Sequence, residues 1–513
     1  MTENTASPTP FAETDLRQKP QREPMPVITA TEMAPPRPQA NRAATAGVAA
    51  VSAALLMTEL ALTRIFSVTM YYHFAFLAIS IALFGLSASG VAVYLLRRRL
   101  APVDTGVLLA VIATAHAFAT LVALAWLVRI HVGLDYSLEN LKLMLAIYAL
   151  AALPFFTGGG VMSVAFSRMT DRINVLYAAD LIGAAAGCLA LIPLLNWVGA
   201  PGVVMMAAGL SAIGAIAFAP AAYRRNFTVV VFGLMAMISL AHASGITPFD
   251  LVDTKGHAGD RVLFSKWNSF SRVAVYDRPF GDWSLSPKFA GDRAQTLFMD
   301  IDSAAATPIL KGSGNVSDAA YLRYELTAIA YHLAGRKAGF NALVIGTGGG
   351  RDLLSALVFG AAHVDGVEIN PIIARDVMLD RFREYSGGIY ANPRVTIHVD
   401  DGRNYVRRSQ SKYDVIQASL VDTWAATAAG AYTLTENSLY TKEAFDEYLD
   451  HLTDDGVLTI TRWVFDGLRL VSLAQEVCAE RGLDPAQHLA IVQYDRVATF
   501  LLKKQPFTPL DVA

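Results

Sequence analysis

Two short stretches decide the fold of the C-terminal half: VIGTGGGRDLL at residues 344–354 and VEINP at residues 367–371. In the first, an apolar run that fits a buried strand leads into a glycine-rich turn and then a helical pattern. The glycines expected to meet a ligand are Gly346, Gly348 and Gly350. Lacking side chains, they let the backbone approach a ligand closely. In the second, Glu368 ends the next apolar run, where a carboxylate can accept both ribose hydroxyls of an adenosine. Together the stretches predict a nucleoside-binding site.

Strand and helix patterns alternate around these two stretches. Short apolar runs, each fitting a buried strand, are separated by helical patterns. The runs begin near residues 341, 363, 394, 413, 456 and 498. This alternation is typical of a doubly wound, mostly parallel sheet, which binds its ligands at the carboxyl ends of the strands. We therefore expect an α/β Rossmann-like domain at residues 336–513, and the family resemblance given below implies that it binds an S-adenosyl group.

The segment before this domain has the pattern of strands followed by a helix. Between residues 261 and 300, short β-branched and aromatic runs are broken by Gly, Pro and Asp, which predicts a small antiparallel sheet. Residues 318–334 then fit a helix with Asp318 as its N-cap. We expect residues 246–335 to form a small β-rich subdomain plus this helix.

Acidic residues also follow the third and fourth predicted strands. Asp401 and Gly402 come after the third, where an acidic-Gly pair is well placed to hydrogen-bond an adenine amino group. Ser419 and Asp422 come after the fourth, beside the place of a transferable group. For Asp401 and Asp422, helix capping or a solvated turn is the alternative.

Several motifs resemble the spermidine synthase family. They are IGTGGG at 345–350, VEINP at 367–371, DGR at 401–403, YDVI at 413–416 and LYTKEAFDEYL at 439–449. The resemblance covers roughly residues 260–505 and extends to bacterial variants that carry a membrane bundle before this domain. It implies the fold of class I S-adenosylmethionine methyltransferases, with Glu368 on the ribose, Asp401 on the adenine, and the glycine turn against the donor.

The departures from that family concern the group to be transferred. The family carries an Asp-Ser-x-Asp run after the fourth strand, whereas here Ser419 replaces the first aspartate and only Asp422 remains. Gly349 stands where the family has an aspartate that holds the ammonium of decarboxylated S-adenosylmethionine. Arg351, two positions on, could pair with the α-carboxylate of intact S-adenosylmethionine, which favours the intact donor. The alternative is that Arg351 faces solvent or caps a neighbouring loop.

The N-terminal half has a different composition. Residues 1–42 are rich in proline and poor in large apolar residues, which predicts a disordered tail. Residues 43–245 contain only ten Lys or Arg and six Asp or Glu. Seven apolar stretches in this region are long enough to cross a hydrocarbon core of about 30 Å as helices. They run approximately over 44–67, 71–96, 105–130, 140–167, 176–198, 201–222 and 226–244. We expect a multi-pass α-helical membrane bundle.

The orientation of this bundle involves two conflicting arguments. Arginines follow the second, fourth and sixth stretches, so the positive-inside rule puts those ends in the cytoplasm and the C-terminal half outside. The donor, however, is a cytosolic metabolite, and we give this argument more weight. We expect a protein of the cell inner membrane whose catalytic domain is cytoplasmic, with either a broken stretch or a misleading arginine bias. The fourth stretch, with Pro154 and Gly158–Gly160, is the candidate for a break.

Some residues inside these stretches are polar. Ionisable groups at membrane depth indicate a functional site, although pairing that holds the bundle together is the alternative. These residues are Glu59, Arg64, His73, His116 and Asp180. Gly183 and Gly187, four residues apart, suit close helix packing.

The composition excludes several classes of protein. Of the 513 residues only 17% are charged, against about 25% in soluble domains. The net charge is −2, which argues against nucleic-acid binding. The two cysteines, Cys188 and Cys478, exclude a disulfide scaffold and a cysteine-built zinc site, and we expect no metal.

The leading hypothesis is a membrane-embedded transferase that moves methyl from S-adenosylmethionine to a small-molecule or amphiphilic acceptor. Asp422 or Glu325 would orient or deprotonate that acceptor. The first alternative is aminopropyl transfer from decarboxylated S-adenosylmethionine to a diamine, as in polyamine biosynthesis. The second is a transporter or sensor whose nucleotide domain binds without catalysis. Membrane lipid is an expected partner, and a homodimer is compatible with each hypothesis.

Overall fold

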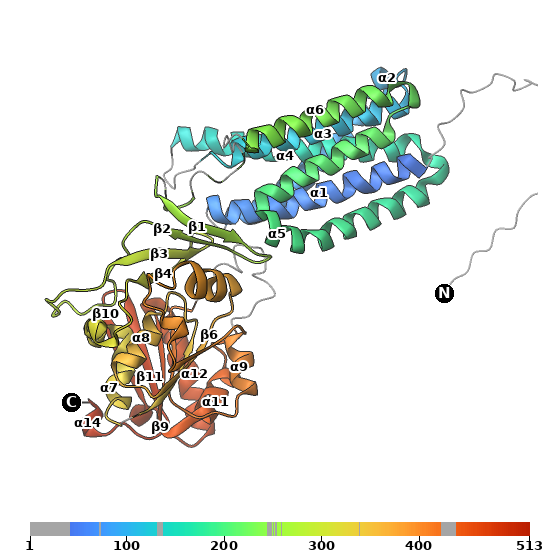
Figure 1. Cartoon of the computed structure of the whole chain (residues 1–513). Coiled ribbons are helices and arrows are strands. Elements are labelled where there is room, and N and C mark those ends of the chain that lie inside the picture. Colours follow the sequence, from blue (N-terminus) through green and yellow to red (C-terminus); the bar gives the residue numbers. More distant parts are fainter. Residues whose placement is uncertain are drawn as a thin grey trace, which may run out of the picture. The chain divides into compact units, whose positions relative to one another are not determined.

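The computed structural model contains a helical bundle followed by an α/β region, and residues Gln39–Ala513 form one compact unit (Figure 1). The residues it describes are 42–70, 73–130, 137–243, 249, 251, 254–257, 259–337, 339–421 and 438–512. The tail predicted to be disordered lies outside these residues, apart from Arg42, which begins the first helix. The predicted catalytic residue Asp422 also lies outside them.

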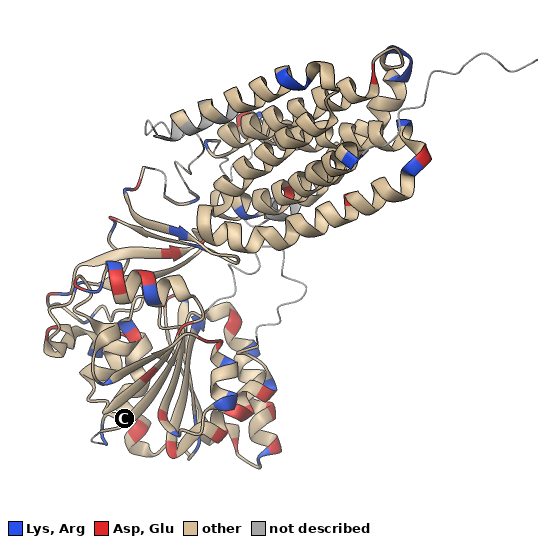
Figure 2. Ribbon diagram, turned by 45° about the vertical axis from the view of Figure 1, so that its right-hand side comes forward, with Lys and Arg blue, Asp and Glu red and all other residues tan. Residues whose placement is uncertain are grey.

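The bundle consists of long apolar helices. They are α1 (Arg42–Thr69), α2 (His73–Leu100), α3 (Thr105–Leu127), α4 (Leu138–Arg168), the short η1 (Thr170–Arg172), α5 (Ile173–Phe218) and α6 (Ala221–Ala243). Charged residues are sparse along them and frequent in the C-terminal region (Figure 2). By length and composition alone, five helical segments of the described chain could cross a membrane. They are Arg42–Thr69, Ala78–Leu100, Thr105–Leu127, Leu138–Arg168 and Thr170–Phe218.

Helix α5 is a hairpin of two helical arms joined at Gly199. Gly199 has φ of 69°, in the left-handed region that favours glycine, so the helix cannot continue through it. Both arms pack on α1, with residue numbers rising in parallel in the first arm and in opposite order in the second. The contacting pairs are Gly183 with Ala49, Gly187 with Ala53, Gly214 with Val51 and Phe218 with Gly47. The predicted stretches 176–198 and 201–222 are these two arms.

The expected break in the fourth stretch is wrong, because α4 is continuous from Leu138 to Arg168. Pro154 lies inside it, and the Thr157 hydroxyl donates to the carbonyls of Leu153 and Pro154 within the same turn. The following glycines serve packing instead: a Cβ on Gly158 would lie 2.5 Å from Leu55 of α1. A glycine run therefore marks close helix contact here and not a helix end.

A four-stranded antiparallel sheet follows the bundle, in the order β1-β2-β3-β4. The strands are β1 (Val262–Trp267), β2 (Arg272–Tyr276), β3 (Thr296–Ile301) and β4 (Ala305–Leu310). The predicted helix 318–334 is wrong in detail: its place is taken by 3-10 turns η2 (Val316–Tyr324) and η3 (Leu326–Ala328) and the short α7 (Ile329–Ala334). Glu325 is extended and interrupts the helical path. The cap is Asn315, whose side chain accepts from the Ser317 amide, whereas Asp318 accepts from the Ser313 hydroxyl.

The second sheet has seven strands in the order β10-β11-β9-β8-β5-β6-β7. The strands are β5 (Asn341–Ile345), β6 (His363–Val367), β7 (Val395–His398), β8 (Tyr413–Ser419), β9 (Leu452–Trp463), β10 (Leu489–Tyr494) and β11 (Val497–Lys503). Strands β5 to β9 pair in parallel, and β11 and β10 add an antiparallel edge. The sheet is therefore mixed and Rossmann-like, and β10 is a strand that the sequence patterns do not predict.

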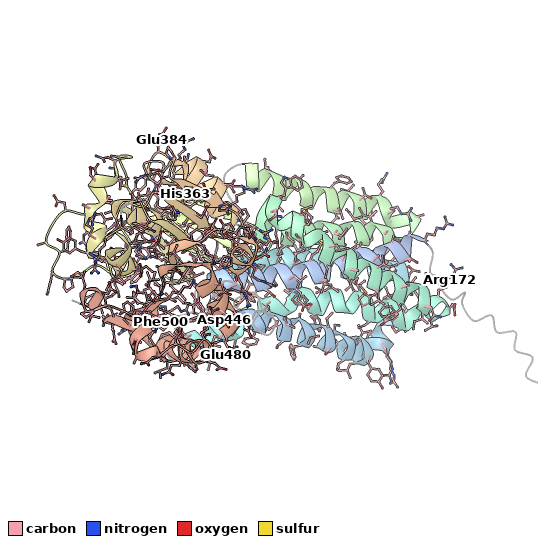
Figure 3. The ribbon with its side chains drawn as sticks, turned by 90° about the horizontal axis from the view of Figure 1, so that it is seen from below. Arg172, His363, Glu384, Asp446, Glu480 and Phe500 are labelled. Atoms are coloured by element: carbon pink, nitrogen blue, oxygen red, sulfur yellow. The ribbon has the colours of Figure 1, made fainter. Side chains whose placement is uncertain are left out.

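Helices cover the seven-stranded sheet on both faces, with buried apolar clusters on each side. They are α8 (Arg351–Val358), η4 (Ile372–Arg381), η5 (Ile389–Ala391), α9 (Gly402–Arg408), α11 (Lys442–His451), η7 (Val464–Asp466), α12 (Gly467–Glu480), α13 (Pro485–His488) and α14 (Pro509–Val512). Among them, η4 is a π-helix. Phe500 of β11 is buried, and Figure 3 labels it in this domain and Arg172 on the bundle.

We predict that Gly183→Ala lowers the free energy of unfolding by about 2 kcal/mol, since overpacking a tight contact has about this cost. The added Cβ would lie 2.2 Å from the carbonyl oxygen of Ala49, a backbone atom that cannot rotate away. Thermal unfolding in detergent measures the change. Gly233→Ala on α6 is the control, because nothing lies within 4 Å of a Cβ there and the substitution should be neutral or stabilising. Equal unfolding temperatures for the two variants would contradict the packing argument.

Candidate functional site

The glycine turn and Glu368 lie side by side at the carboxyl ends of two neighbouring parallel strands. Ile345 at the end of β5 pairs with Val367 at the end of β6. The Glu368 carboxylate accepts from the amide of Gly348 at 2.9 Å and from the amide of Asn370 at 2.9 Å. The two segments that the sequence predicts to clasp a nucleoside are therefore in direct contact.

Glu368 is a buried carboxylate, with 4% of its surface exposed. Burial raises its pKa above the usual 4.5, while hydrogen bonds from the Asn370 and Gly348 amides act in the opposite direction. A buried anion needs such donors, because leaving it unpaired would be costly. Its surroundings thus fix the position of the carboxylate.

A tyrosine that the sequence patterns do not single out holds the glycine turn. The hydroxyl of buried Tyr390 donates to the carbonyl of Gly348 at 2.6 Å and lies 2.6 Å from the Thr347 hydroxyl. Gly346, Gly348 and Gly350 all have positive φ, of 74°, 48° and 86°, so non-glycine residues would be strained there. Gly346 and Gly348 are only partly buried and leave backbone exposed toward a ligand.

Strand β4 of the small sheet packs directly on this turn. The Gly349 amide faces the Thr307 hydroxyl at 3.4 Å. A Cβ on Gly349 would lie 1.9 Å from the Pro308 carbonyl oxygen. No side chain fits at this position while β4 stays in place, so glycine is required at position 349.

The β1–β2 turn supports the Glu368 segment in a similar way. Asn370 donates from its side-chain amide to the Ser271 hydroxyl at 2.8 Å and accepts from Asn268 at 3.0 Å. All three side chains are buried. Asn370 stood in the VEINP stretch, but its partners come from a different part of the chain.

Asp401 and Gly402 have structural roles at the start of α9. Asp401 caps this helix, because its Oδ1 accepts from the Asn404 amide at 2.9 Å. This is the alternative that the sequence left open for Asp401. Gly402 is required by packing, since a Cβ there would lie 2.5 Å from Ile345. Both residues nevertheless follow β7 at the carboxyl edge of the sheet, one strand beyond Glu368.

The end of β8 leads toward the segment that contains Asp422. Ser419 accepts from the side-chain amide of Gln417 at 3.0 Å. Leu420 has φ of 49°, an unusual value for a leucine. The next carbonyl, of Val421, accepts from Tyr440 and from Arg462, both at 3.1 Å. The backbone is thus held in a strained conformation directly before Asp422, and such strain clusters at functional sites.

Arg351 turns inward and is only 11% exposed at its side chain. Its guanidinium lies 3.3 Å from the Asp352 carboxylate, 3.4 Å from the Ser284 hydroxyl and 4.9 Å from the centre of the Trp283 ring. It therefore does not face solvent, and Asp352 already balances its charge. This arrangement weakens the prediction that Arg351 binds the carboxylate of a ligand.

Glu325 belongs to the same cluster, because the Ser284 hydroxyl donates to its carboxylate. Glu325 also lines an open pocket of about 560 Å³ between η2, η3 and the end of β10. The pocket mixes polar and apolar side chains. Those lining it include Ser286, Tyr324, Leu326, Ile329, His332, Val492 and Tyr494. A second molecule could therefore reach Glu325 from solvent.

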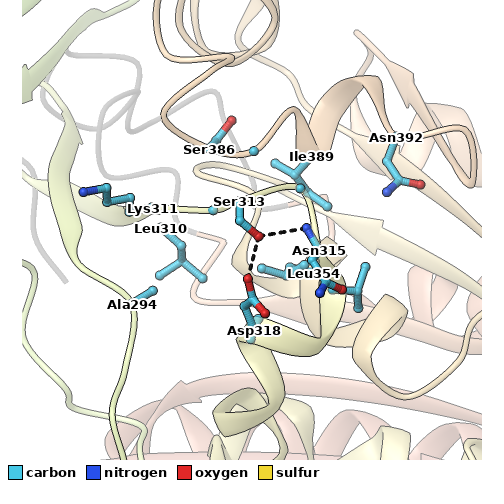
Figure 4. A pocket seen from close by; sticks show the side chains of 15 residues that line it. Ala294, Leu310, Lys311, Ser313, Asn315, Asp318, Leu354, Ser386, Ile389 and Asn392 are labelled. Carbon is cyan, nitrogen blue, oxygen red and sulfur yellow. Dashed lines mark hydrogen bonds between the residues drawn. The ribbon is translucent and has the colours of Figure 1, made fainter.

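A smaller pocket lies between the end of β4, the start of η2 and residues 386–392 (Figure 4). Its volume is about 40 Å³, room for a few water molecules and not for a nucleotide. Ser313 bridges Asp318 and the Asn315 amide at its rim. Ile389, which lines it, also packs against Gly350. Among the described residues, no group of three or more His, Cys, Asp or Glu side chains could hold a metal ion.

The fold and the site define a Rossmann-like domain in which the glycine turn contacts Glu368. Residues 329–464 match the family model described as a spermine/spermidine synthase domain. This part of the chain is spermidine synthase-like, as its motifs indicate. The match includes the glycine turn, Glu368 and Asp401.

Similar proteins are found in archaea and bacteria. A polyamine aminopropyltransferase of Korarchaeum cryptofilum (strain OPF8) is 31% identical over 119 residues, which are 23% of this chain and 34% of that protein. One of Alkaliphilus metalliredigens (strain QYMF) is 29% identical over 119 residues, 23% of this chain and 38% of that protein. The matches thus span little more than a third of these curated relatives. The crystal structure of spermidine synthase from Thermotoga maritima is 16% identical, covering 49% of this chain and 75% of that one, with a TM-score of 0.33.

We predict that binding of an adenosine ligand weakens as pH falls toward 4.5, with a midpoint above that value. The raised pKa means that Glu368 takes up its proton at a higher pH than an ordinary glutamate, and the neutral acid can no longer accept both ribose hydroxyls. Loss of a charged hydrogen bond has a cost of about 2 kcal/mol, or roughly thirtyfold in affinity. Calorimetric titration with 5′-methylthioadenosine at several pH values measures this. Glu368→Gln should bind weakly with a flat pH profile. Constant wild-type affinity down to pH 4.5 would contradict the assignment.

Proposed function

We propose that the C-terminal domain is a transferase that moves an aminopropyl group from decarboxylated S-adenosylmethionine to an amine. The observation that carries this proposal is the contact between Gly348 and Glu368 inside the segment that matches the spermine/spermidine synthase domain. The names of the matched relatives, polyamine aminopropyltransferases, support the same activity. This reverses the order of the two transferase hypotheses drawn from the sequence.

The reaction asks little of the protein beyond alignment. The amine nitrogen attacks the aminopropyl carbon that is bonded to the sulfonium sulfur. The N–C bond forms as this C–S bond breaks, and 5′-methylthioadenosine leaves. The attacking amine loses one proton. Holding nitrogen, carbon and sulfur in line supplies much of the acceleration. Glu368 and the glycine turn would hold the adenosine end of the donor, as the buried carboxylate and the exposed backbone permit.

The proton needs a carboxylate near the acceptor. Glu325 is suited to this role, because it lines the open pocket and is bound to Ser284, which in turn contacts Arg351 next to the glycine turn. Asp422, two residues after the strained backbone at Leu420, is the second candidate. A carboxylate in either place could orient the amine and accept its proton.

Methyl transfer from intact S-adenosylmethionine is the second candidate activity. Gly349 favours it, because the aspartate that would hold the ammonium of the decarboxylated donor is missing. Arg351 no longer favours it, because Asp352 and Ser284 occupy its guanidinium. We rank aminopropyl transfer first because the match to the spermine/spermidine synthase domain and to polyamine aminopropyltransferases supports it, despite the missing aspartate.

The test is to incubate purified full-length protein with putrescine and each donor in turn. We expect spermidine and 5′-methylthioadenosine with the decarboxylated donor, detected by mass spectrometry, and an activity loss of at least about a hundredfold in Glu368→Ala, in line with loss of a positioning contact. Methylated products with the intact donor would instead establish the methyl alternative. Donor binding without turnover of either donor would establish the binding-only sensor or transporter and overturn the transferase.

We also propose that the bundle lies in the cell inner membrane, with membrane lipid around it and the transferase domain in the cytoplasm. The apolar helices support insertion, and donor supply supports the orientation. The position of the arginines argues for the opposite orientation. Arg168 donates to the carbonyls of Leu100 and Val103, so the ends of α2 and α4 meet, far from the end where α6 leads into the domain. Entry of an amphiphilic acceptor from the bilayer would explain the fusion.

Reporter fusions after residue 512 test the orientation. We expect a cytoplasmic fluorescent reporter to be active there and an alkaline phosphatase reporter to be inactive. The matched control is a fusion after Arg99, at the other end of the bundle, which should give the reverse pattern because an odd number of crossings separates the two points. Phosphatase activity after residue 512 would put the domain outside the cytoplasm and overturn this part of the proposal.

A further inference from the structure

The small antiparallel sheet contacts the helical bundle at one end of its hairpins. In the β3–β4 turn, the Asp302 carboxylate accepts from the guanidinium of Arg64 on α1, at 3.0 and 3.2 Å. In β1, Trp267 packs against Gly199, at the turn of the α5 hairpin, where a Cβ would lie 2.6 Å from the indole. Two separate hairpins of this sheet are therefore attached to two separate helices of the bundle.

The same two hairpins hold both halves of the nucleoside clasp. Five residues after Asp302, Thr307 and Pro308 press on Gly348 and Gly349. One residue after Trp267, the side chain of Asn268 donates a hydrogen bond to the side chain of Asn370. The backbone amide of Asn370 in turn donates to the Glu368 carboxylate. Each attachment to the bundle is thus connected, through a few residues of one hairpin, to one binding segment.

The Arg64–Asp302 contact is built for position more than for stability. Both side chains are almost completely buried, at 5% and 0% exposure. Asp302 also accepts from the Arg272 amide at 2.7 Å, and both Asp302 and Ser303 have φ of 52°. A left-handed pair of non-glycine residues persists only where its surroundings impose it. The β3–β4 hairpin turn, closed by the Ala304 amide donating to the Ile301 carbonyl at 3.1 Å, supplies that constraint, and the buried ion pair holds this turn against α1.

Other charged or titratable residues near this pair lie between α6 and β1 in the sequence or in the small sheet. Lys255 donates to the carbonyl of Ser67 on α1 at 2.6 Å, and its charge lies near Asp302 and Asp300. His257 bridges Asp300 and Asp260, at 2.8 and 2.9 Å. These contacts hold Lys255 and His257 in place, but none of them involves a residue of the glycine turn. Arg64 is the bundle residue whose partner leads directly into β4.

We propose that Arg64 of helix α1 is a positioning residue for the donor site: through Asp302 and strand β4 it holds the glycine turn in the geometry that binds the adenosyl donor. The inference rests on the proposed function, since it concerns the same site. It makes donor affinity a property of the whole chain, bundle included.

The test measures donor binding and turnover in the full-length protein in nanodiscs. We expect Arg64→Met to raise the donor dissociation constant about tenfold, the size of a typical coupling between sites, with a much smaller change in the KM for the acceptor. Arg64→Lys, which keeps the charge, should restore most of the affinity. Asp302→Asn should weaken donor binding like Arg64→Met, and the double variant should be no worse than either single one.

Arg168→Met is the matched control. Like Arg64, Arg168 joins its helix to another part of the chain, but its guanidinium donates to the backbone carbonyls of Leu100 and Val103 and not to a carboxylate. It should leave the donor dissociation constant unchanged even where it lowers the unfolding temperature. If Arg64→Met and Asp302→Asn have lower unfolding temperatures yet bind the donor like the wild type, the contact is structural only and the inference is wrong. If Arg64→Met fails to fold, the comparison of Asp302→Asn with Arg64→Lys decides. If the wild-type protein binds neither donor, it is the proposed function that fails.

Discussion

The candidate site depends on a buried carboxylate that two backbone amides hold. Glu368 is almost fully enclosed and accepts from the amides of Gly348 and Asn370. Desolvation penalises a charge in such a place, so the donors have to be fixed before a ligand arrives. Positive φ in the glycine turn, the Tyr390 hydroxyl on the Gly348 carbonyl and the Asn370 network all serve to fix them. The fixed donors offset part of the desolvation that raises the pKa of Glu368, and they set the position of its carboxylate.

Much of the C-terminal fold follows from local patterns. Apolar runs of strand length and helical spacing are visible in the sequence, and the carboxyl ends of parallel neighbours must share an edge, so Gly348 and Glu368 could be brought together without a structure. Strand β10 escapes the patterns because it is an edge strand, only partly buried along its length. The Tyr390 contact escapes them for another reason: the residue it holds lies 42 positions away, and nothing local marks it.

The misassigned helix break shows the same limit in the bundle. Pro154 and three consecutive glycines look locally like an interruption, whereas Gly199 stands between apolar segments with a proline on either side. The residues that surround these glycines distinguish the two cases. Gly158 faces Leu55 on another helix, so the missing side chain allows close packing within a continuous helix. Gly199 adopts a left-handed conformation that ends one arm and begins the next. Composition alone cannot separate these two uses of glycine.

The buried ion pair between α1 and the small sheet raises the question of why it is charged at all. An apolar pair of the same size is often as stable or more so, because desolvating two ions offsets most of their attraction. Such an apolar contact would, however, tolerate sliding, whereas Arg64 and Asp302 meet in a defined geometry and the Arg272 amide adds a third direction. The β3–β4 turn has to deliver Pro308 to within a bond length or so of where a Gly349 side chain would stand. A contact with direction suits that demand better than one with only area, and glycine at position 349 leaves room for the strand that the turn leads into.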